Sequence, residues 1–434
     1  AAQLTNFTAG ELSPRLDGRN DLAKYSAGCA TVENMVIYPH GAAARRPGTQ
    51  FVASVKTPAA KTRLIPFEFS TEQTYILEFG NQYIRFYRNN GQIESSGSAY
   101  EISTPYLTAE LFDIKFAQSA DVMYITHPNH QTRKLSRTGH TSWSLAAVEF
   151  TNGPFLDSNI TTTTLTPASA GVGTGVNVTA SAVTGINGGS GFLTTDVGRQ
   201  IRIGDGYGII TARTNTTVVV VTVTTAFANA NANSDWSLGS FSTTTGFPSC
   251  VSFFEQRLVF AASINNPQTV YFSKSGDYEN MDANIGGTVA DDDAIIYTIA
   301  SNQVNAIRFL TSARTLIIGT AGGEFVVSGG GDNNAVTPTN IMIKKQSNHG
   351  AANVDAISVG NATLFLQRAK RKIRELAYNF DVDGYIAPDL TILAEHITEG
   401  NVVEMAYQEE PLAIIWCVRG DGQLIALTYQ REQE

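Results

Sequence analysis

The chain repeats one pattern of hydrophobic and polar positions six times. Each copy has an apolar stretch, a short turn, a second and more apolar stretch, another turn, and a third stretch in which polar and apolar residues alternate. Short β-branched and aromatic runs between turns are typical of β-strands. The first strands of the six copies are predicted over residues 63–69, 112–116, 251–254, 306–310, 356–359 and 403–405.

The spacing of these copies indicates the architecture. Equivalent first-strand positions are Ile65, Ile114, Val251, Ile307, Ile357 and Met405, and they are separated by 49, 137, 56, 50 and 48 residues. Removing the 88 residues 157–244 returns the long interval to 49. A repeat of about 50 residues with three or four strands is typical of a β-propeller blade. The sequence therefore predicts a mainly β fold with a six-bladed, propeller-like body.

The segment 157–244 differs in character from the repeats. It contains no lysine, is rich in Thr, Gly and Asn, and has strand-like runs at 200–203 and 216–224. The pairs Asn187-Gly188 and Asp205-Gly206 are typical of tight turns between strands. We expect a small inserted β-barrel or β-sandwich domain, placed between the second and third blades.

The N-terminal residues predict an arm with one helix. Asn20 can cap a helix over 20–36, in which apolar residues recur every three or four positions at Leu22, Tyr25, Cys29, Val32 and Met35. The expected domains are an arm at 1–60, blades one and two at 61–156, the insert at 157–244, and blades three to six at 245–434. Since a strand over 423–427 runs almost to Glu434, we expect the natural chain to continue beyond that residue.

Composition narrows the function classes. Only 16% of the 434 residues are charged and 42% are hydrophobic, which excludes a disordered chain. The net charge of −9 argues against a generally basic surface that grips nucleic-acid phosphates. No apolar run approaches the roughly 20 residues of a membrane helix, so no membrane span is expected.

Signatures of catalysis and of cofactor binding are missing from the sequence. It has neither the Gly-rich phosphate loop nor the Gly-x-Ser-x-Gly elbow of hydrolases. His127, His130 and His140 lie within fourteen residues, but that stretch holds no acidic residue to complete or orient a metal site. Asp291 to Asp293 are expected in a solvated loop. We therefore expect no enzyme activity, no metal and no cofactor.

One dense basic run lies on the turn and third strand of the predicted fifth blade. Its members are Arg368, Lys370, Arg371, Lys372 and Arg374. Charge at a strand edge prevents unwanted pairing with other strands. Two functional readings stay open beside this structural one, namely contact with an acidic neighbouring subunit and a ring of cations in the DNA channel of an assembly.

Several short motifs, in order along the chain, resemble one family. The N-terminal ones are Phe7-Thr-Ala-Gly-Glu-Leu-Ser-Pro-Arg15, Gly18-Arg19-Asn-Asp-Leu22, Pro39-His-Gly41 and Arg45-Arg46-Pro47-Gly48-Thr49. Later ones are Gly246-Phe-Pro248, Gln256-Arg257-Leu258, and Ala387-Pro-Asp389-Leu390-Thr391 followed by His396. In order and spacing they resemble the tail nozzle proteins, also called tail tubular proteins B, of short-tailed bacteriophages.

The resemblance implies a structural protein of the virion tail, assembled in the cytoplasm of a bacterial host. Six copies would form a ring below the portal adaptor, carry tail fibres or spikes, and pass double-stranded DNA without sequence-specific binding. Arg45 and Arg46 would serve assembly or packing, and no catalysis is implied. Two alternatives remain: a receptor-binding or polysaccharide-degrading tail protein that uses the insert or a blade cleft, and a free-standing propeller that binds other proteins.

Overall fold

The computed structural model describes residues 5–300, 305–330 and 335–431, and these residues form a mainly β fold. The chain divides into two compact units. The terminal unit comprises Ala1–Val52, Arg308–Val326 and Lys344–Glu434, and the insert-bearing unit comprises Ala53–Ile307 and Val327–Ile343. Within the described ranges, no helix is long and apolar enough to cross a membrane.

Three antiparallel sheets, the first of five strands and the others of four, follow one another in the insert-bearing unit. The first contains β5 (Arg63–Ser70), β6 (Gln73–Gly80), β7 (Tyr83–Arg88) and β11 (Glu101–Ser103). The second contains β12 (Lys115–Ser119), β13 (Val122–His127), β14 (His130–Gly139) and β15 (Ser142–Ala147). The third contains β22 (Cys250–Phe254), β23 (Arg257–Ala261), β24 (Thr269–Phe272) and β25 (Ile295–Thr298).

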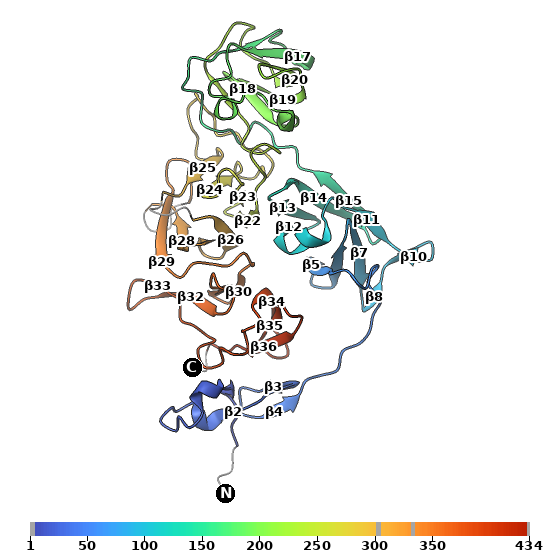
Figure 1. Cartoon of the computed structure of the whole chain (residues 1–434), viewed down its shortest axis with the longest axis vertical. Coiled ribbons are helices and arrows are strands. Elements are labelled where there is room, and N and C mark those ends of the chain that lie inside the picture. The colour runs from blue at the N-terminus through green and yellow to red at the C-terminus, as the bar shows by residue number, and fades with distance from the viewer. Residues whose placement is uncertain (1–4, 301–304, 331–334, 432–434) are drawn as a thin grey trace. The chain divides into compact units, whose positions relative to one another are not determined.

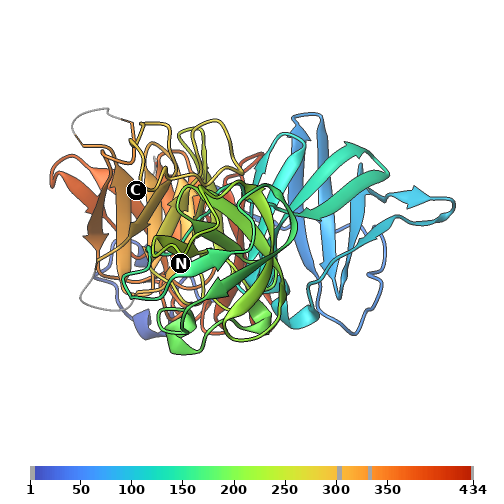
Figure 2. The same ribbon diagram turned by 90° about the horizontal axis from the view of Figure 1, so that it is seen from above.

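A small hairpin extends the first of these sheets. It consists of β9 (Glu94–Ser95) and β10 (Ser98–Ala99), and it follows β8 (Gly91–Gln92), which pairs with β7. Both views of the chain show this hairpin projecting away from the sheet (Figures 1 and 2).

Successive sheets of this unit share their cores, as propeller blades do. One buried cluster joins Phe67 and Phe86 of the first sheet to Met123 and Leu135 of the second. Another joins Tyr124 of the second sheet to strands β22 to β24 of the third. Each sheet thus covers a face that its neighbour would otherwise expose to water.

Three further sheets follow along the chain. They are formed by β26 (Ile307–Ser312), β27 (Leu316–Thr320), β28 (Gly323–Ser328) and β29 (Met342–Ser347); by β30 (Ile357–Val359), β31 (Ala362–Leu366), β32 (Ile373–Asn379) and β33 (Gly384–Ile386); and by β34 (Val402–Gln408), β35 (Ile414–Arg419) and β36 (Leu424–Thr428). In the terminal unit, Phe309 packs with Phe365, and Leu364 packs with Ile415. These sheets too are joined face to face.

These six sheets confirm the mainly β, propeller-like fold and the six repeated strand groups. One predicted strand was misplaced. Residues 112–116 begin with the end of a 3-10 helix, η3 (Thr108–Asp113), and β12 starts only at Lys115. The carboxylate of Glu110 accepts a hydrogen bond from the Leu107 N–H and thereby stabilises this turn.

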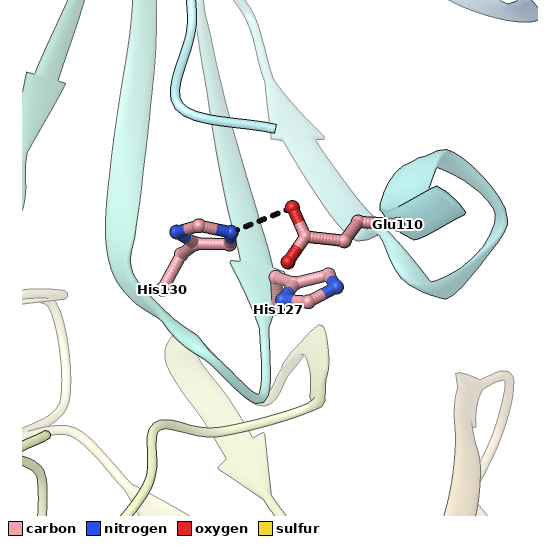
Figure 3. Close-up of side chains that lie close together, drawn as sticks. All are labelled: Glu110, His127 and His130. Carbon is pink, nitrogen blue, oxygen red and sulfur yellow. Dashed lines mark hydrogen bonds and ion pairs between the residues drawn. The ribbon is translucent and has the colours of Figure 1, made fainter. Parts of the chain in front are cut away.

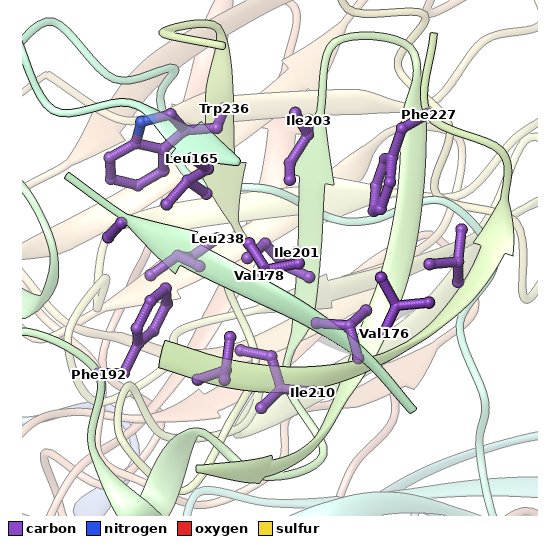
Figure 4. Close-up of a cluster of buried hydrophobic side chains, with 14 of the residues drawn as sticks. Leu165, Val176, Val178, Phe192, Ile201, Ile203, Ile210, Phe227, Trp236 and Leu238 are labelled. Atoms are coloured by element: carbon purple, nitrogen blue, oxygen red, sulfur yellow. The ribbon is translucent and has the colours of Figure 1, made fainter. Parts of the chain in front are cut away.

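The insert contains one curved six-stranded sheet around its own core. Its strands are β16 (Leu165–Pro167), β17 (Gly173–Ala180), β18 (Gln200–Ile203), β19 (Gly206–Arg213), β20 (Val218–Thr225) and β21 (Trp236–Leu238), in the order β16-β17-β20-β19-β18-β21. The sheet bends into a half-barrel, and the apolar side chains gather on its inner face (Figure 4). In β20, buried and less buried residues alternate: Val219, Val221 and Val223 are buried, and the residues between them are half-buried.

The predicted helix over 20–36 was wrong. This part of the terminal unit contains the one-turn 3-10 helix η2 (Tyr25–Ala27), β2 (Gly28–Cys29) and β3 (Met35–Ile37). The apolar residues spaced three or four apart remain half-buried or exposed, so no core stabilises a helix there. Gly28 instead pairs with Gly10 of β1 (Gly10–Glu11). A Cβ added at Gly28 would lie 2.2 Å from the Leu12 side chain, so only glycine fits there without moving Leu12.

The rest of the arm is short and irregular. It includes a 3-10 turn, η1 (Pro14–Leu16), and a hairpin in which β3 pairs with β4 (Ala43–Arg45).

Candidate functional site

Three side chains that can ligate a metal ion lie together at one end of the second sheet (Figure 3). His127 ends β13 and His130 begins β14, and the tight turn between them pairs the two residues across the hairpin. Glu110 comes from η3, which precedes the sheet. The ligand atoms of all three residues lie within 4.8 Å of one another.

Glu110 is held from two sides. Its Oε2 lies 2.8 Å from Nε2 of His130 and accepts the backbone N–H of Leu107 at 2.9 Å. Burial opposes ionisation of the carboxyl, but the hydrogen bonds from Leu107 and His130 outweigh it and lower the pKa of Glu110. The cluster therefore presents a carboxylate at neutral pH.

His127 is almost fully buried, with 2% of its surface exposed. The Asn129 N–H donates to its Nδ1 at 3.2 Å, which leaves the ring proton on Nε2 in the neutral imidazole. That Nε2 has no hydrogen-bond partner among the described residues. Burial, reinforced by the neighbouring His130, lowers the pKa of His127, so the ring is uncharged at neutral pH.

Tyr106 closes the cluster on another side. Its ring lies 5.3 Å from that of His130 and 6.1 Å from that of His127, measured between centroids. The residue is fully buried, and its hydroxyl is a second polar group without a hydrogen-bond partner in the described part of the chain. A buried hydroxyl left in this state costs on the order of 1–3 kcal/mol.

The acidic member of this cluster was missed in the sequence. Glu110 lies seventeen positions before His127, at the edge of the segment predicted as a strand, and no spacing pattern links the two. His140, which the sequence groups with the other histidines, lies outside the cluster. Its ring contacts Tyr75 Oη at 2.6 Å and a guanidinium nitrogen of Arg88 at 2.9 Å.

Most of the basic run forms contacts within its own unit. Lys372 lies 2.8 Å from a carboxylate oxygen of Asp389, and Arg371 lies 3.6 Å from Glu399. Arg374 donates to the Ala387 carbonyl at 2.6 Å and to Gln367 at 2.9 Å. These contacts give three of the five residues partners within the unit, but β32 (Ile373–Asn379) is an inner strand of its sheet, so the run does not protect a strand edge.

The other predicted site residues lie in the turn before β32 and in the arm. Arg368 is exposed and Lys370 half-buried in the turn before β32. Arg45 is exposed at the end of β4. The backbone N–H of Arg46 donates to the Asn34 carbonyl, and its guanidinium donates to the Pro47 carbonyl. Nothing in these contacts gives any of the four a chemical role.

Asp389 gives a pH-dependent test of the basic run. Burial opposes its ionisation, but Lys372 and two hydrogen bonds from Thr391 outweigh it and lower the pKa of Asp389 in the folded protein. Its ion pair therefore stabilises the fold above the unfolded pKa, and this contribution is lost as the pH falls through the folded pKa. Because Lys372 is half-exposed, we expect Asp389→Asn to destabilise the protein by about 1 kcal/mol at pH 7. Urea unfolding from pH 7 down to pH 2 measures this, and a difference that stays the same over the whole range would contradict it.

The acidic run Asp291 to Asp293 is partly structural, contrary to the predicted solvated loop. Asp293 is buried, pairs with Lys274 at 2.7 Å and accepts the Ala290 N–H at 2.8 Å. The Arg257 guanidinium donates to the backbone carbonyls of all three aspartates. These bonds order the loop before β25.

A cavity of about 410 Å³ is lined by residues of the insert and by the loop that precedes β24. Asn159, Asn187, Thr244 and Asn266 contribute amides and hydroxyls to its lining. Asp157 is the one carboxylate among the lining residues that the structure describes. Glycosidases generally need a pair of carboxylates, so this lining suits binding of a polar ligand better than cleavage of a glycoside.

No family model and no curated protein matches the chain. Solved structures that it resembles include a streptogramin B lyase (11% identity, TM-score 0.35, 82% of this chain and 90% of that one). Others are the Cps50 (Swd1) β-propeller domain of Myceliophteria thermophila (8%, 0.37, 82% and 80%) and YCF48 bound to D1 peptide (9%, 0.36, 87% and 98%). At such low TM-scores, we take no functional argument from these proteins.

Proposed function

We propose that the protein is a structural subunit of a bacteriophage tail, a nozzle that assembles as a hexameric ring and conducts the genome. One observation supports this most. Two of the motif segments that resemble tail nozzle proteins, residues 7–15 and 387–396, are far apart in the sequence and contact each other directly in the terminal unit. Motifs that hold one another in space are better explained by a shared fold than by chance matches.

The contacts between these segments are specific. Glu11 accepts the Val32 N–H at 2.6 Å through one carboxylate oxygen, and its other oxygen lies 2.8 Å from Nε2 of His396. The Ser13 N–H donates to the Leu393 carbonyl at 2.8 Å, and Arg15 forms an ion pair with Glu395. The arm is therefore fastened to the segment between β33 and β34 at three points.

The charge of the chain suits a conduit. A channel that passes DNA must not retain it, and retention grows with every phosphate that a basic side chain neutralises. A chain with a net charge of −9, whose densest basic run is largely paired internally, offers few such contacts. Large neutral β surfaces can instead form the identical interfaces that close a ring.

The test is assembly with the portal adaptor. We expect the chain, mixed with the adaptor of its own phage, to form six-fold rings visible by electron microscopy. Glu11→Ala should release the arm and reduce ring yield severalfold, whereas Arg19→Ala, which removes an exposed arm ion pair with Asp21, should not. A protein that stays monomeric with its adaptor would refute the proposal.

A receptor-binding role is the second candidate, and the cavity beside the insert, with its amide and hydroxyl groups, is the observation that favours it. Saturable binding of host envelope polysaccharide that is lost in Asn187→Ala would support this role. Such binding without ring formation would replace the nozzle proposal, and cleavage of the polysaccharide would show a degrading enzyme.

A further inference from the structure

We propose that Glu110, His127 and His130 bind one zinc ion at the end of the β13–β14 hairpin. Two imidazoles and one carboxylate form an established donor set for Zn²⁺. The site is independent of the proposed tail function, because it rests only on side chains of the second sheet and of η3.

The spacing of the ligand atoms fits one ion. Zinc bonds of about 2.0–2.1 Å in tetrahedral geometry place neighbouring ligand atoms about 3.3 Å apart. Nε2 of His130 and Oε2 of Glu110 are 2.8 Å apart, and the whole set lies within 4.8 Å. Shifts of about 1 Å in side-chain position therefore bring all three onto one ion.

The unpartnered buried groups point to a ligand as well. His127 Nε2 and the Tyr106 hydroxyl are both buried and lack a partner among the described residues. Three protein ligands leave a fourth zinc position for water. A metal ion would engage the His127 imidazole, the unpartnered group that belongs to the cluster itself.

Zinc binding through Nε2 requires His127 to change tautomer. Coordination through Nε2 moves the ring proton to Nδ1, and the 3.2 Å hydrogen bond from Asn129 is then lost. A hydrogen bond of this kind contributes only about 0.5–1.5 kcal/mol, much less than a zinc–imidazole bond. Coordination through Nδ1 would displace the same hydrogen bond, so either mode costs little by comparison.

The bound ion would fasten η3 to the hairpin. At present a single contact between Glu110 and His130 joins these elements within the cluster. A zinc ion adds His127 to that link and connects the turn before the second sheet with its two central strands. We therefore expect the bound ion to stabilise this end of the sheet.

The experiment uses the untagged full chain, stripped of metal with a chelator and dialysed against ZnCl₂. We expect one zinc per chain by elemental analysis, a higher melting temperature with zinc than without, and, with Co²⁺ in its place, the intense visible absorption of a tetrahedral site. Glu110→Gln keeps an acceptor for the Leu107 N–H and should fold. Glu110→Gln and His130→Gln should each weaken zinc binding at least about 10-fold.

His140→Gln is the matched control, since it removes a histidine of the same sheet that lies outside the cluster. It should bind zinc as the unaltered chain does. The proposal is overturned if less than a stoichiometric amount of zinc is retained, or if His140→Gln weakens binding as much as His130→Gln. It is also overturned if Glu110→Gln folds, binds zinc as tightly as the unaltered chain, and shows the same rise in melting temperature with zinc.

Discussion

Replacing Arg199 by methionine is expected to destabilise the inserted domain by about 3–5 kcal/mol. Arg199 is 1% exposed, and it is the largest fully buried side chain of the described chain. Its guanidinium donates to the Gly239 carbonyl at 2.7 Å, to the side-chain oxygen of Asn187 at 2.8 Å and to Asp196 at 2.9 Å. Methionine fills a similar volume but leaves these three acceptors unsatisfied.

The cost arises mainly at Asp196, which is completely buried. This carboxylate also accepts the Leu193 N–H at 2.8 Å, the Asn187 amide at 2.7 Å and the Thr244 hydroxyl at 2.7 Å. Without the guanidinium these donors face a buried charge that has no counterion, and a buried charge of this kind is far more costly than a broken surface pair.

Hydrogen exchange measured by mass spectrometry can localise the effect. Backbone amides of β18 to β20 should exchange much faster in Arg199→Met, while those of β5 to β7 keep their protection. Arg19→Met is the matched control, because Arg19 forms an exposed ion pair with Asp21 and its loss should leave exchange in the insert unchanged. Unchanged protection of β18 to β20 in Arg199→Met would show that the ion pair between Arg199 and Asp196 contributes little to the stability of the insert.

The repeated strands could be predicted from the sequence because both signals that define them are local. The alternation of apolar and polar residues marks each strand, and the repeat of about 50 residues marks where each new sheet begins. The arm could not be predicted in the same way. Leu22, Tyr25 and Cys29 have helical spacing, but whether a helix forms depends on a surface on which to bury that face, and the terminal unit supplies none.

The candidate site was predictable only in part, for the same reason. His127 and His130 are close in sequence because a tight hairpin separates them. Glu110 joins them through a turn that it stabilises itself by accepting the Leu107 N–H. A contact between separate elements produces no periodic pattern in the sequence. His140 is close to the other two histidines in sequence, but it follows the far end of β14 and so lies away from them.

Trp143→Ala is the second substitution with a large expected effect, about 3–5 kcal/mol of lost stability in the insert-bearing unit. Trp143 belongs to β15 of the second sheet, yet its ring packs on three aromatic rings of the first. It stacks on Phe86 at 4.5 Å between centroids and meets Phe67 at 4.8 Å and Tyr75 at 5.2 Å edge to face. Its Nε1 also donates to the His140 carbonyl at 3.1 Å. Alanine leaves a cavity between two sheets that the surrounding rings can fill only partly, because the strands that carry them are fixed by their hydrogen bonds.

Trp416→Ala separates this effect from the loss of any large aromatic residue. Trp416 is only half-buried on β35, and its Nε1 bonds to Gln408 at 2.9 Å, so alanine there removes less buried surface and should cost clearly less. If successive sheets support one another through shared cores, Trp143→Ala should speed amide exchange in β5 to β7 as well as in β12 to β15. Faster exchange in the second sheet alone would mean that each sheet is stable without its neighbour, which would contradict the face-to-face packing as the source of propeller stability in this chain.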